Sequence, residues 1–329
     1  MQATTNIPVN SIADYFILNG YSTEQSGLFH GKAGMALLLF EIAHTLDNER
    51  IEAHAFDIFS QAMLTQTQSV ALSDGLAGIG YALRYLLNRH YLEGEFEELF
   101  DVQTSQITDR LDEADALGPR FESTALATLH FVTPEKRATL SESVCEALNN
   151  LRDRLYEQLA DAECVSFALM KQIVWLYKLC NWYTPKTKTI HTDLLSERLY
   201  TLHRAGKLAL PLVLYLFLPD KQAHRPALKA YRAIGHSLPF SEQLFLAEAR
   251  YQSGEGSLAQ CYDRPLSLTD MEQLYAGMHF KTALRHGLGL YWWYARRQQG
   301  DQDIVRLLYD LFLLPDDCMP FTKKAEDCK

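Results

Sequence analysis

Apolar residues recur along the chain three or four positions apart, the spacing of amphipathic helices, and the predicted helices come in pairs. The first pair covers 35–46 and 51–62, and the second covers 76–87 and 99–107, where Leu99, Val102 and Ile107 predict the buried face. Two more pairs follow over 121–132 with 140–155 and over 165–180 with 194–202. Because strand-type alternation is nearly absent, the chain is predicted to be all-α.

Turn residues divide the helices at a regular interval. The first helix of each pair opens near Gly31, Gly75, Gly118, about Cys164, Gly206, about Pro239 and Gly287. Successive openings are 44, 43, 46, 42, 33 and 48 residues apart. A period of about 43 residues that holds two helices is typical of a helical repeat protein. The interval therefore predicts about seven helix-hairpin repeats.

Two architectures accommodate seven helix pairs: an open solenoid with polar end units, and a closed ring. The first helices of several pairs, at 35–46, 76–87, 165–180 and 208–218, are apolar around much of their circumference, whereas the helices at 138–159 and 189–204 are more charged. This contrast favours an α/α toroid, a double ring with an inner and an outer layer. We expect an N-terminal extension over 1–26, the toroid over 27–314 and a C-terminal tail or lid over 315–329.

Composition narrows the classes of function. The chain carries 31 Lys+Arg and 41 Asp+Glu, so its net charge is 31 − 41 = −10, and this balance argues against a nucleic-acid partner. The six cysteines show no CxxC spacing, and no run of 18 apolar residues predicts a transmembrane segment. The N-terminus has neither the basic nor the apolar region of a secretory signal. We expect a cytoplasmic protein with reduced cysteines.

The glycines that open the helices allow two interpretations. In the first, Gly31 and Gly75 adopt a positive φ before the first helical turn, and other glycines permit a neighbouring helix to approach closely. In the second, free N–H groups at the N-termini of several inner helices converge at one opening of the ring, here called the mouth, and form a cleft for an anion. Both interpretations are compatible with one structure.

Two of these openings resemble a known family. The sequences GLFHGKAGMAL at 27–37 and LSDGLAGIGYAL at 72–83 are similar to the helix-opening repeats of the lanthionine synthetase C-like (LanC-like) family, and RHGLGLY at 285–291 is similar to its closing repeat. The resemblance implies a double α-toroid of seven inner and seven outer helices. It also implies an enzyme in which zinc, held by two cysteines and a histidine, activates a cysteine thiol of a ribosomally made peptide for thioether formation.

The zinc ligands that the resemblance implies are missing. Where the family has its first cysteine ligand, this chain has Arg204, and where it has the CHG motif, this chain has either His236 after Gly235 or His286 after Arg285. One histidine cannot form the usual zinc site, and a guanidinium repels the metal. We therefore expect no metal and a catalytically degenerate cyclase homologue, a pseudoenzyme. A replacement zinc site formed by Cys261, His279 and His286 stays open as an alternative.

Charged residues near the predicted mouth are the candidate binding site. Cationic groups there suit a carboxylate or a phosphate, although they also suit an acidic protein surface that they simply neutralise. His30 and Asp74, beside the helix openings, are predicted to face the same mouth. In the alternative interpretation, they only cap helices. The candidates for the cleft are His30, Asp74, Arg120, Arg204, His236, Arg285 and His286.

These observations predict a protein of peptide modification that binds a peptide, or a partner modification enzyme, in the toroid mouth without performing the cyclisation. A first alternative is an active enzyme on the same toroid. It would be a noncanonical zinc cyclase, or a glycoside hydrolase or lyase with Asp74 and Glu122 as its carboxylate pair. A second alternative is an interaction module whose outer helices bind partners, which an exposed apolar patch on that layer would reveal.

Overall fold

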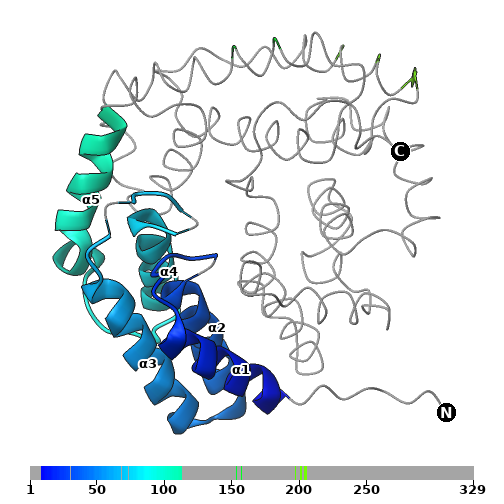
Figure 1. The fold of residues 1–329 in the computed structure, drawn as a ribbon, viewed down its shortest axis with the longest axis vertical. Coiled ribbons are helices and arrows are strands. Elements are labelled where there is room, and N and C mark those ends of the chain that lie inside the picture. The colour runs from blue at the N-terminus through cyan, green and yellow to red at the C-terminus, as the bar shows by residue number, and fades with distance from the viewer. Residues whose placement is uncertain are drawn as a thin grey trace. The chain divides into compact units, whose positions relative to one another are not determined.

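The computed structural model describes residues 9–29, 31–67, 69–72 and 74–112, and six separate residues between 153 and 205. The two groups belong to different compact units of the chain. The first group contains five helices and no strand, which confirms the helical prediction for this part (Figure 1). The helices are α1 (Val9–Ser22), α2 (Lys32–Leu46), α3 (Glu49–Leu64), α4 (Leu76–Asn88) and α5 (Phe96–Asp112). The predicted helices beyond 112 lie outside the described residues.

Helix α1 lies within the segment expected to be an N-terminal extension, where no helix was predicted. Its buried side chains Ile12 and Phe16 and the buried Gly20 follow one another at intervals of four residues, so they share one face. This face packs against α2 and α3, and Gly20 lies against Ile58 of α3. The helix is therefore part of the same core as α2 and α3.

Helices α2 and α3 form the first predicted hairpin. Every residue of α2 from Ala33 to Ala43 is buried, which agrees with the prediction that this helix is apolar around much of its circumference. The turn is made by Asp47, with a φ of 48°, and by Asn48, whose side chain accepts hydrogen bonds from two N–H groups of α3. Helix α3 buries one stripe, as predicted: Ile51, Ala55, Ile58, Phe59 and Ala62.

Helices α4 and α5 form the second hairpin, and the face predicted for α5 is confirmed at Ile107 but wrong at Leu99 and Val102. Leu99 is 43% exposed and Val102 is 67% exposed, whereas Phe96, Phe100 and Ile107 are buried. Aromatic rings bury more apolar area than Leu or Val, so the two phenylalanines determine which face packs. Helix α4 contacts both α2 and α5, and it is buried through most of its length, as α2 is.

The glycines that begin α2 and α4 do not have the predicted positive φ. Gly31 has φ −127° and Gly75 has φ −122°, values that any residue adopts. What these positions lack is space. A methyl group on Gly31 would lie 2.6 Å from the carbonyl carbon of Ser26, and one on Gly75 would lie 2.6 Å from the backbone nitrogen of Ala71. The preceding loop therefore requires glycine at both openings.

A third glycine joins the two hairpins. A methyl group on Gly78, in the first turn of α4, would overlap the carbonyl oxygen of Leu72 and would lie 2.6 Å from the backbone nitrogen of Leu28. Leu72 is in the loop before α4, and Leu28 is in the loop before α2. The predicted close approach is therefore confirmed at Gly78, although the partners are loop backbones of both repeats and not a neighbouring helix.

None of the helices in the described part of the chain is long and apolar enough to cross a lipid bilayer.

We predict that Gly78→Ala lowers the free energy of unfolding by about 2–4 kcal/mol, because the added methyl group overlaps backbone atoms that cannot move independently. Gly20→Ala is the matched control. There the added methyl group meets no backbone, its nearest contact being the terminal methyl group of Ile58, and alanine is the better helix former. Urea denaturation measures the unfolding free energy of both variants. Equal losses of stability would contradict the role given to Gly78.

Candidate functional site

Two of the seven residues predicted to line the cleft are described. Asp74 is exposed directly before α4, and its Oδ1 accepts a hydrogen bond of 3.2 Å from the Ser69 hydroxyl. Arg204 is exposed at a helical position in the other compact unit. Both side chains are therefore accessible to solvent. They belong to different compact units of the chain. The others lie outside the described residues: His30, Arg120, His236, Arg285 and His286.

The N–H groups at the start of α2 are already bonded to the preceding loop. Lys32 N–H donates to the Gln25 carbonyl at 2.9 Å, Ala33 N–H to the Ser26 carbonyl at 3.1 Å, and Gly34 N–H donates to the Gly27 carbonyl. The same residue spacing recurs at α4, where Leu76 N–H donates to the carbonyl of Ser69 at 2.9 Å. The second interpretation of the glycines, free N–H groups that receive an anion, therefore fails at α2.

This shared pattern shows that the 44-residue interval is a structural repeat. The bonds from Lys32 and from Leu76 each reach back seven residues, and the two donors are themselves 44 residues apart. Gly31 and Gly75 occupy the same place in the two loops. Each loop folds back over the first turn of the helix that it precedes.

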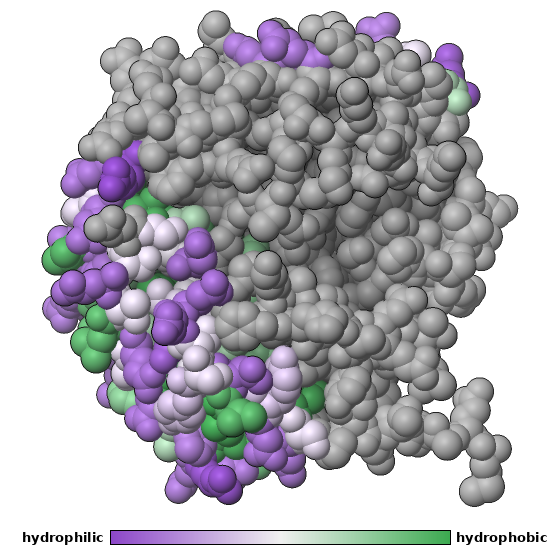
Figure 2. Space-filling view, in the orientation of Figure 1, coloured by the Kyte–Doolittle hydropathy of each residue, from purple (hydrophilic) through white to green (hydrophobic). Residues whose placement is uncertain are grey.

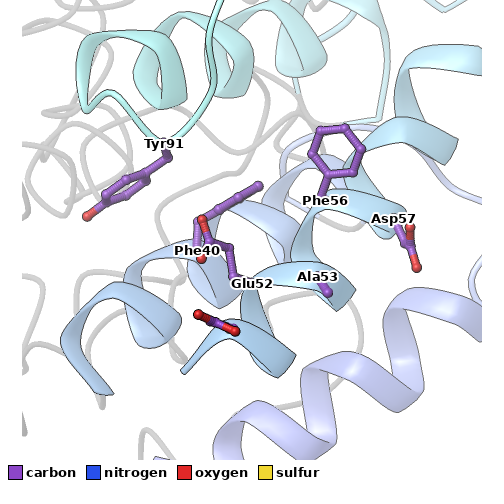
Figure 3. Close-up of a pocket in the computed structure, with 7 residues that line it drawn as sticks. Phe40, Glu52, Ala53, Phe56, Asp57 and Tyr91 are labelled. Atoms are coloured by element: carbon purple, nitrogen blue, oxygen red, sulfur yellow. The ribbon is translucent and has the colours of Figure 1, made fainter. Parts of the chain in front are cut away.

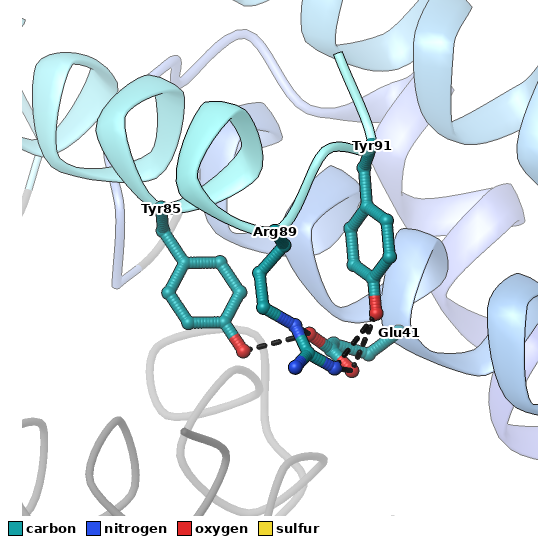
Figure 4. Close-up of polar contacts among 4 residues, drawn as sticks. All are labelled: Glu41, Tyr85, Arg89 and Tyr91. Carbon is teal, nitrogen blue, oxygen red and sulfur yellow. Dashed lines mark hydrogen bonds and ion pairs between the residues drawn. The ribbon is translucent and has the colours of Figure 1, made fainter.

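The second site in this region is a buried polar cluster that the sequence did not reveal. Glu41, on α2, is 1% exposed. Its Oε1 accepts hydrogen bonds from the Tyr85 hydroxyl at 2.6 Å and from Arg89 Nε at 3.2 Å (Figure 4). Its Oε2 accepts from the Tyr91 hydroxyl at 3.2 Å and from Arg89 Nη2 at 3.4 Å. Arg89 also donates to the Tyr91 hydroxyl at 2.9 Å. One carboxylate thus binds three side chains of the next repeat.

The repeat places these groups together. Glu41 and Tyr85 are 44 residues apart, as Gly31 and Gly75 are, so they occupy equivalent positions on α2 and α4. Arg89 is the C-cap residue of α4, and Tyr91 follows in the next loop. The one signal in the sequence is an acidic residue inside an otherwise apolar helix, because a buried charge requires partners. The sequence does not say where those partners lie.

The geometry of the cluster favours a structural role over acid–base catalysis. Burial, and then the negative charge of Glu41, raise the pKa of the Tyr85 hydroxyl far above its usual value, and the same causes raise the pKa of Tyr91. Both hydroxyls therefore stay protonated and act as hydrogen-bond donors. Their protons are directed at Glu41 and not at an open cavity. The arrangement stabilises the contact between α2 and α4.

A pocket of about 360 Å³ lies beside this cluster, between the second half of α2, the first half of α3 and the loop after α4. Phe40 and Tyr91 stack with their ring centres 6.1 Å apart, and in Figure 3 Tyr91 and Phe56 lie on either side of Phe40. The remaining lining residues are Glu49, Glu52, Ala53 and Asp57. The pocket combines aromatic walls with three carboxylates, and it was not predicted from the sequence.

No three His, Cys, Asp or Glu side chains among the described residues come together as a metal site. The proposed replacement ligands, Cys261 and His279 with His286, lie outside those residues, as does Glu122, the expected carboxylate partner of Asp74. Comparison of the chain with protein families, with curated proteins and with solved structures finds no match.

We predict that Glu41→Gln lowers the free energy of unfolding by about 2–4 kcal/mol, because it removes the carboxylate charge that the largely buried Arg89 binds. Glu97→Gln is the matched control: Glu97 pairs with Arg84 at 3.1 Å, but its side chain is 53% exposed, so its loss costs at most about 1 kcal/mol. Urea denaturation of both variants tests this. Similar losses of stability in the two variants would show that the Glu41 cluster contributes no more than the exposed Arg84–Glu97 pair.

We predict a second effect of this cluster at high pH. Because the folded-state pKa values of Tyr85 and Tyr91 are raised above 10.0, folding favours the protonated hydroxyls. Their contribution to stability is complete below pH 10 and is lost as the pH rises above it. The unfolding free energy should fall more steeply above pH 10, by about 1.4 kcal/mol per pH unit for each tyrosine, than in Tyr85→Phe/Tyr91→Phe. Identical slopes would contradict this origin.

Proposed function

We propose that this protein is a divergent relative of the LanC-like family that binds a ribosomally made peptide without zinc-dependent thioether cyclisation. Its fold would be an α/α toroid of about seven helix-hairpin repeats, and its place the cytoplasm. The peptide, or a partner modification enzyme, would bind in the mouth of the ring. Asp74 and Arg204 are the described residues assigned to that site.

The observation that carries this proposal is the paired geometry of the two helix openings. The segments that resemble the family, 27–37 and 72–83, begin two buried helices 44 residues apart, and in both the first helical N–H donates to a loop carbonyl seven residues earlier. A resemblance by chance would not require two segments to share backbone geometry as well as sequence. The spacing of the predicted helix openings continues to Gly287, and this supports further repeats of the same kind.

The missing ligands support binding without cyclisation. The cyclisation of the family needs a metal to supply the thiolate, because a free thiol is mostly protonated near neutral pH. Arg204 occupies the position of one cysteine ligand, and its exposed guanidinium suits a peptide carboxylate. Since the N–H groups of α2 are bonded to their own loop, recognition at the mouth would depend on side chains such as Arg204 and Asp74.

One observation favours a second function, binding of a partner through the outer helices. Leu99 and Val102 are three residues apart on α5 and both are exposed, so they form a small apolar patch. The surface of the described helices in Figure 2 is mostly hydrophilic, with separate apolar side chains. This patch is smaller than most protein interfaces require, and peptide binding is therefore the preferred function.

The proposal predicts binding without chemistry. A synthetic peptide that contains one dehydroalanine and one cysteine should bind the full chain, and its thiol should stay open to alkylation, because no metal thiolate forms. Fluorescence anisotropy measures binding, and mass spectrometry after alkylation counts the free thiol. Loss of the thiol faster than without protein, together with about one zinc per chain, would establish an active cyclase instead.

Two variants test the site. Asp74→Asn and Arg204→Gln should each weaken peptide binding about threefold, because each removes an exposed charge from the mouth. Glu98→Gln, an equally exposed acidic residue in the first turn of α5, should leave binding unchanged. Unchanged binding in all three variants would remove Asp74 and Arg204 from the site.

A further inference from the structure

We infer that the pocket lined by Phe40, Phe56, Tyr91 and three carboxylates binds an arginine side chain of a partner polypeptide. This site is separate from the proposed peptide site. Asp74 and the glycine loops precede α2 and α4, whereas the pocket lies beyond the middle of α2, beside the turn into α3 and the loop after α4. The inference therefore stands or falls independently of peptide binding at the mouth.

The shape of the pocket comes from aromatic side chains with different exposure. Phe40 is 2% exposed and forms the fixed base, with Tyr91 stacked beside it. Tyr91 is held in place from the other side, because its hydroxyl belongs to the Glu41 cluster. Phe56 is 55% exposed and forms a wall that faces solvent (Figure 3). Two fixed rings and one accessible ring form a preorganised surface for a flat group.

The charge of the pocket selects a cation. Glu49, Glu52 and Asp57 line it together, and no basic side chain does. Within the described part of the chain, neither Glu49 nor Glu52 forms an ion pair or a side-chain hydrogen bond. Asp57 accepts a 3.4 Å hydrogen bond from the exposed Tyr21 hydroxyl. A cation in this pocket would therefore displace no existing ion pair of the two glutamates.

The combination of rings and carboxylates favours a guanidinium over an ammonium. A guanidinium is planar, so it stacks on aromatic faces while its N–H groups bond carboxylates at its edge. An ammonium is more strongly hydrated, and it makes point contacts that do not use the flat walls. This chain shows the same preference elsewhere, since the Arg84 guanidinium lies 4.0 Å from the ring centre of Phe96 and bonds Glu97.

The direct test uses three short probes, acetyl-Gly-Arg-Gly-amide and the same tripeptide with lysine or citrulline in place of arginine. Citrulline has the shape of arginine without its charge. The reporter is the ¹³C-labelled methyl group of Ala53 in the full chain, identified by its loss in Ala53→Gly. The Ala53 signal should shift and saturate with the arginine probe. The citrulline probe should bind about tenfold more weakly and the lysine probe about threefold more weakly.

Variants give the second arm of the test. Glu52→Gln should weaken binding of the arginine probe about threefold, and the double variant Glu49→Gln/Glu52→Gln should weaken it about tenfold. Glu98→Gln is the matched control, since Glu98 lies in the first turn of α5 as Glu52 lies in the first turn of α3, but does not line the pocket.

Three results would overturn the inference: no shift of Ala53, equal binding of the citrulline probe, or equal binding of the lysine probe, which would remove the guanidinium preference. A shift of Ala53 with failed binding of the dehydroalanine peptide would reject the proposed function and keep this pocket. Binding of that peptide with no response of Ala53 would do the reverse.

Discussion

The close approach of backbone at Gly78 is the constraint on which the described structure depends. Through it, the loop before α2 and the loop before α4 both touch the first turn of α4. Each loop is also bonded to the start of its own helix by N–H groups that would otherwise lack partners. Glycine is thus required because a side chain has no room at these positions, and not because the backbone has a positive φ. A side chain at Gly78 would separate two repeats at once.

The buried carboxylate of Glu41 fixes the same two helices farther along their length. Because Glu41 and Tyr85 are equivalent residues of successive repeats, one carboxylate joins α2 to α4 and to the loop that carries Tyr91. Removing one partner of a buried, hydrogen-bonded charge is costly, although replacing the whole cluster by apolar side chains can give equal stability. We therefore assign the Glu41 cluster to the specificity of helix pairing. Tyr91 then connects this cluster to the pocket, since its ring forms a pocket wall.

The sequence predicted helices well where apolar spacing dominates, and it predicted contacts poorly. The stripe on α3 and the burial of α2 from Ala33 to Ala43 followed from the spacing and extent of the apolar residues. The face of α5 did not, because Leu99 and Val102 have the right spacing while Phe96 and Phe100 bury more area. Helix α1 was overlooked, although Ile12 and Phe16 carry its signal. The Glu41 cluster and the pocket depend on residues up to 51 positions apart, which no local pattern brings together.

Amide hydrogen exchange at the start of α2 tests the account most directly. If the loop carbonyls of Gln25 and Ser26 bind the N–H groups of Lys32 and Ala33, these amides exchange slowly, and so does the amide of Leu76 in the second repeat. Protection at all three amides is the result that the repeated, closed helix openings predict. Exchange at the rate of an unstructured chain would contradict it, because the helix N-termini would then be free to receive an anion.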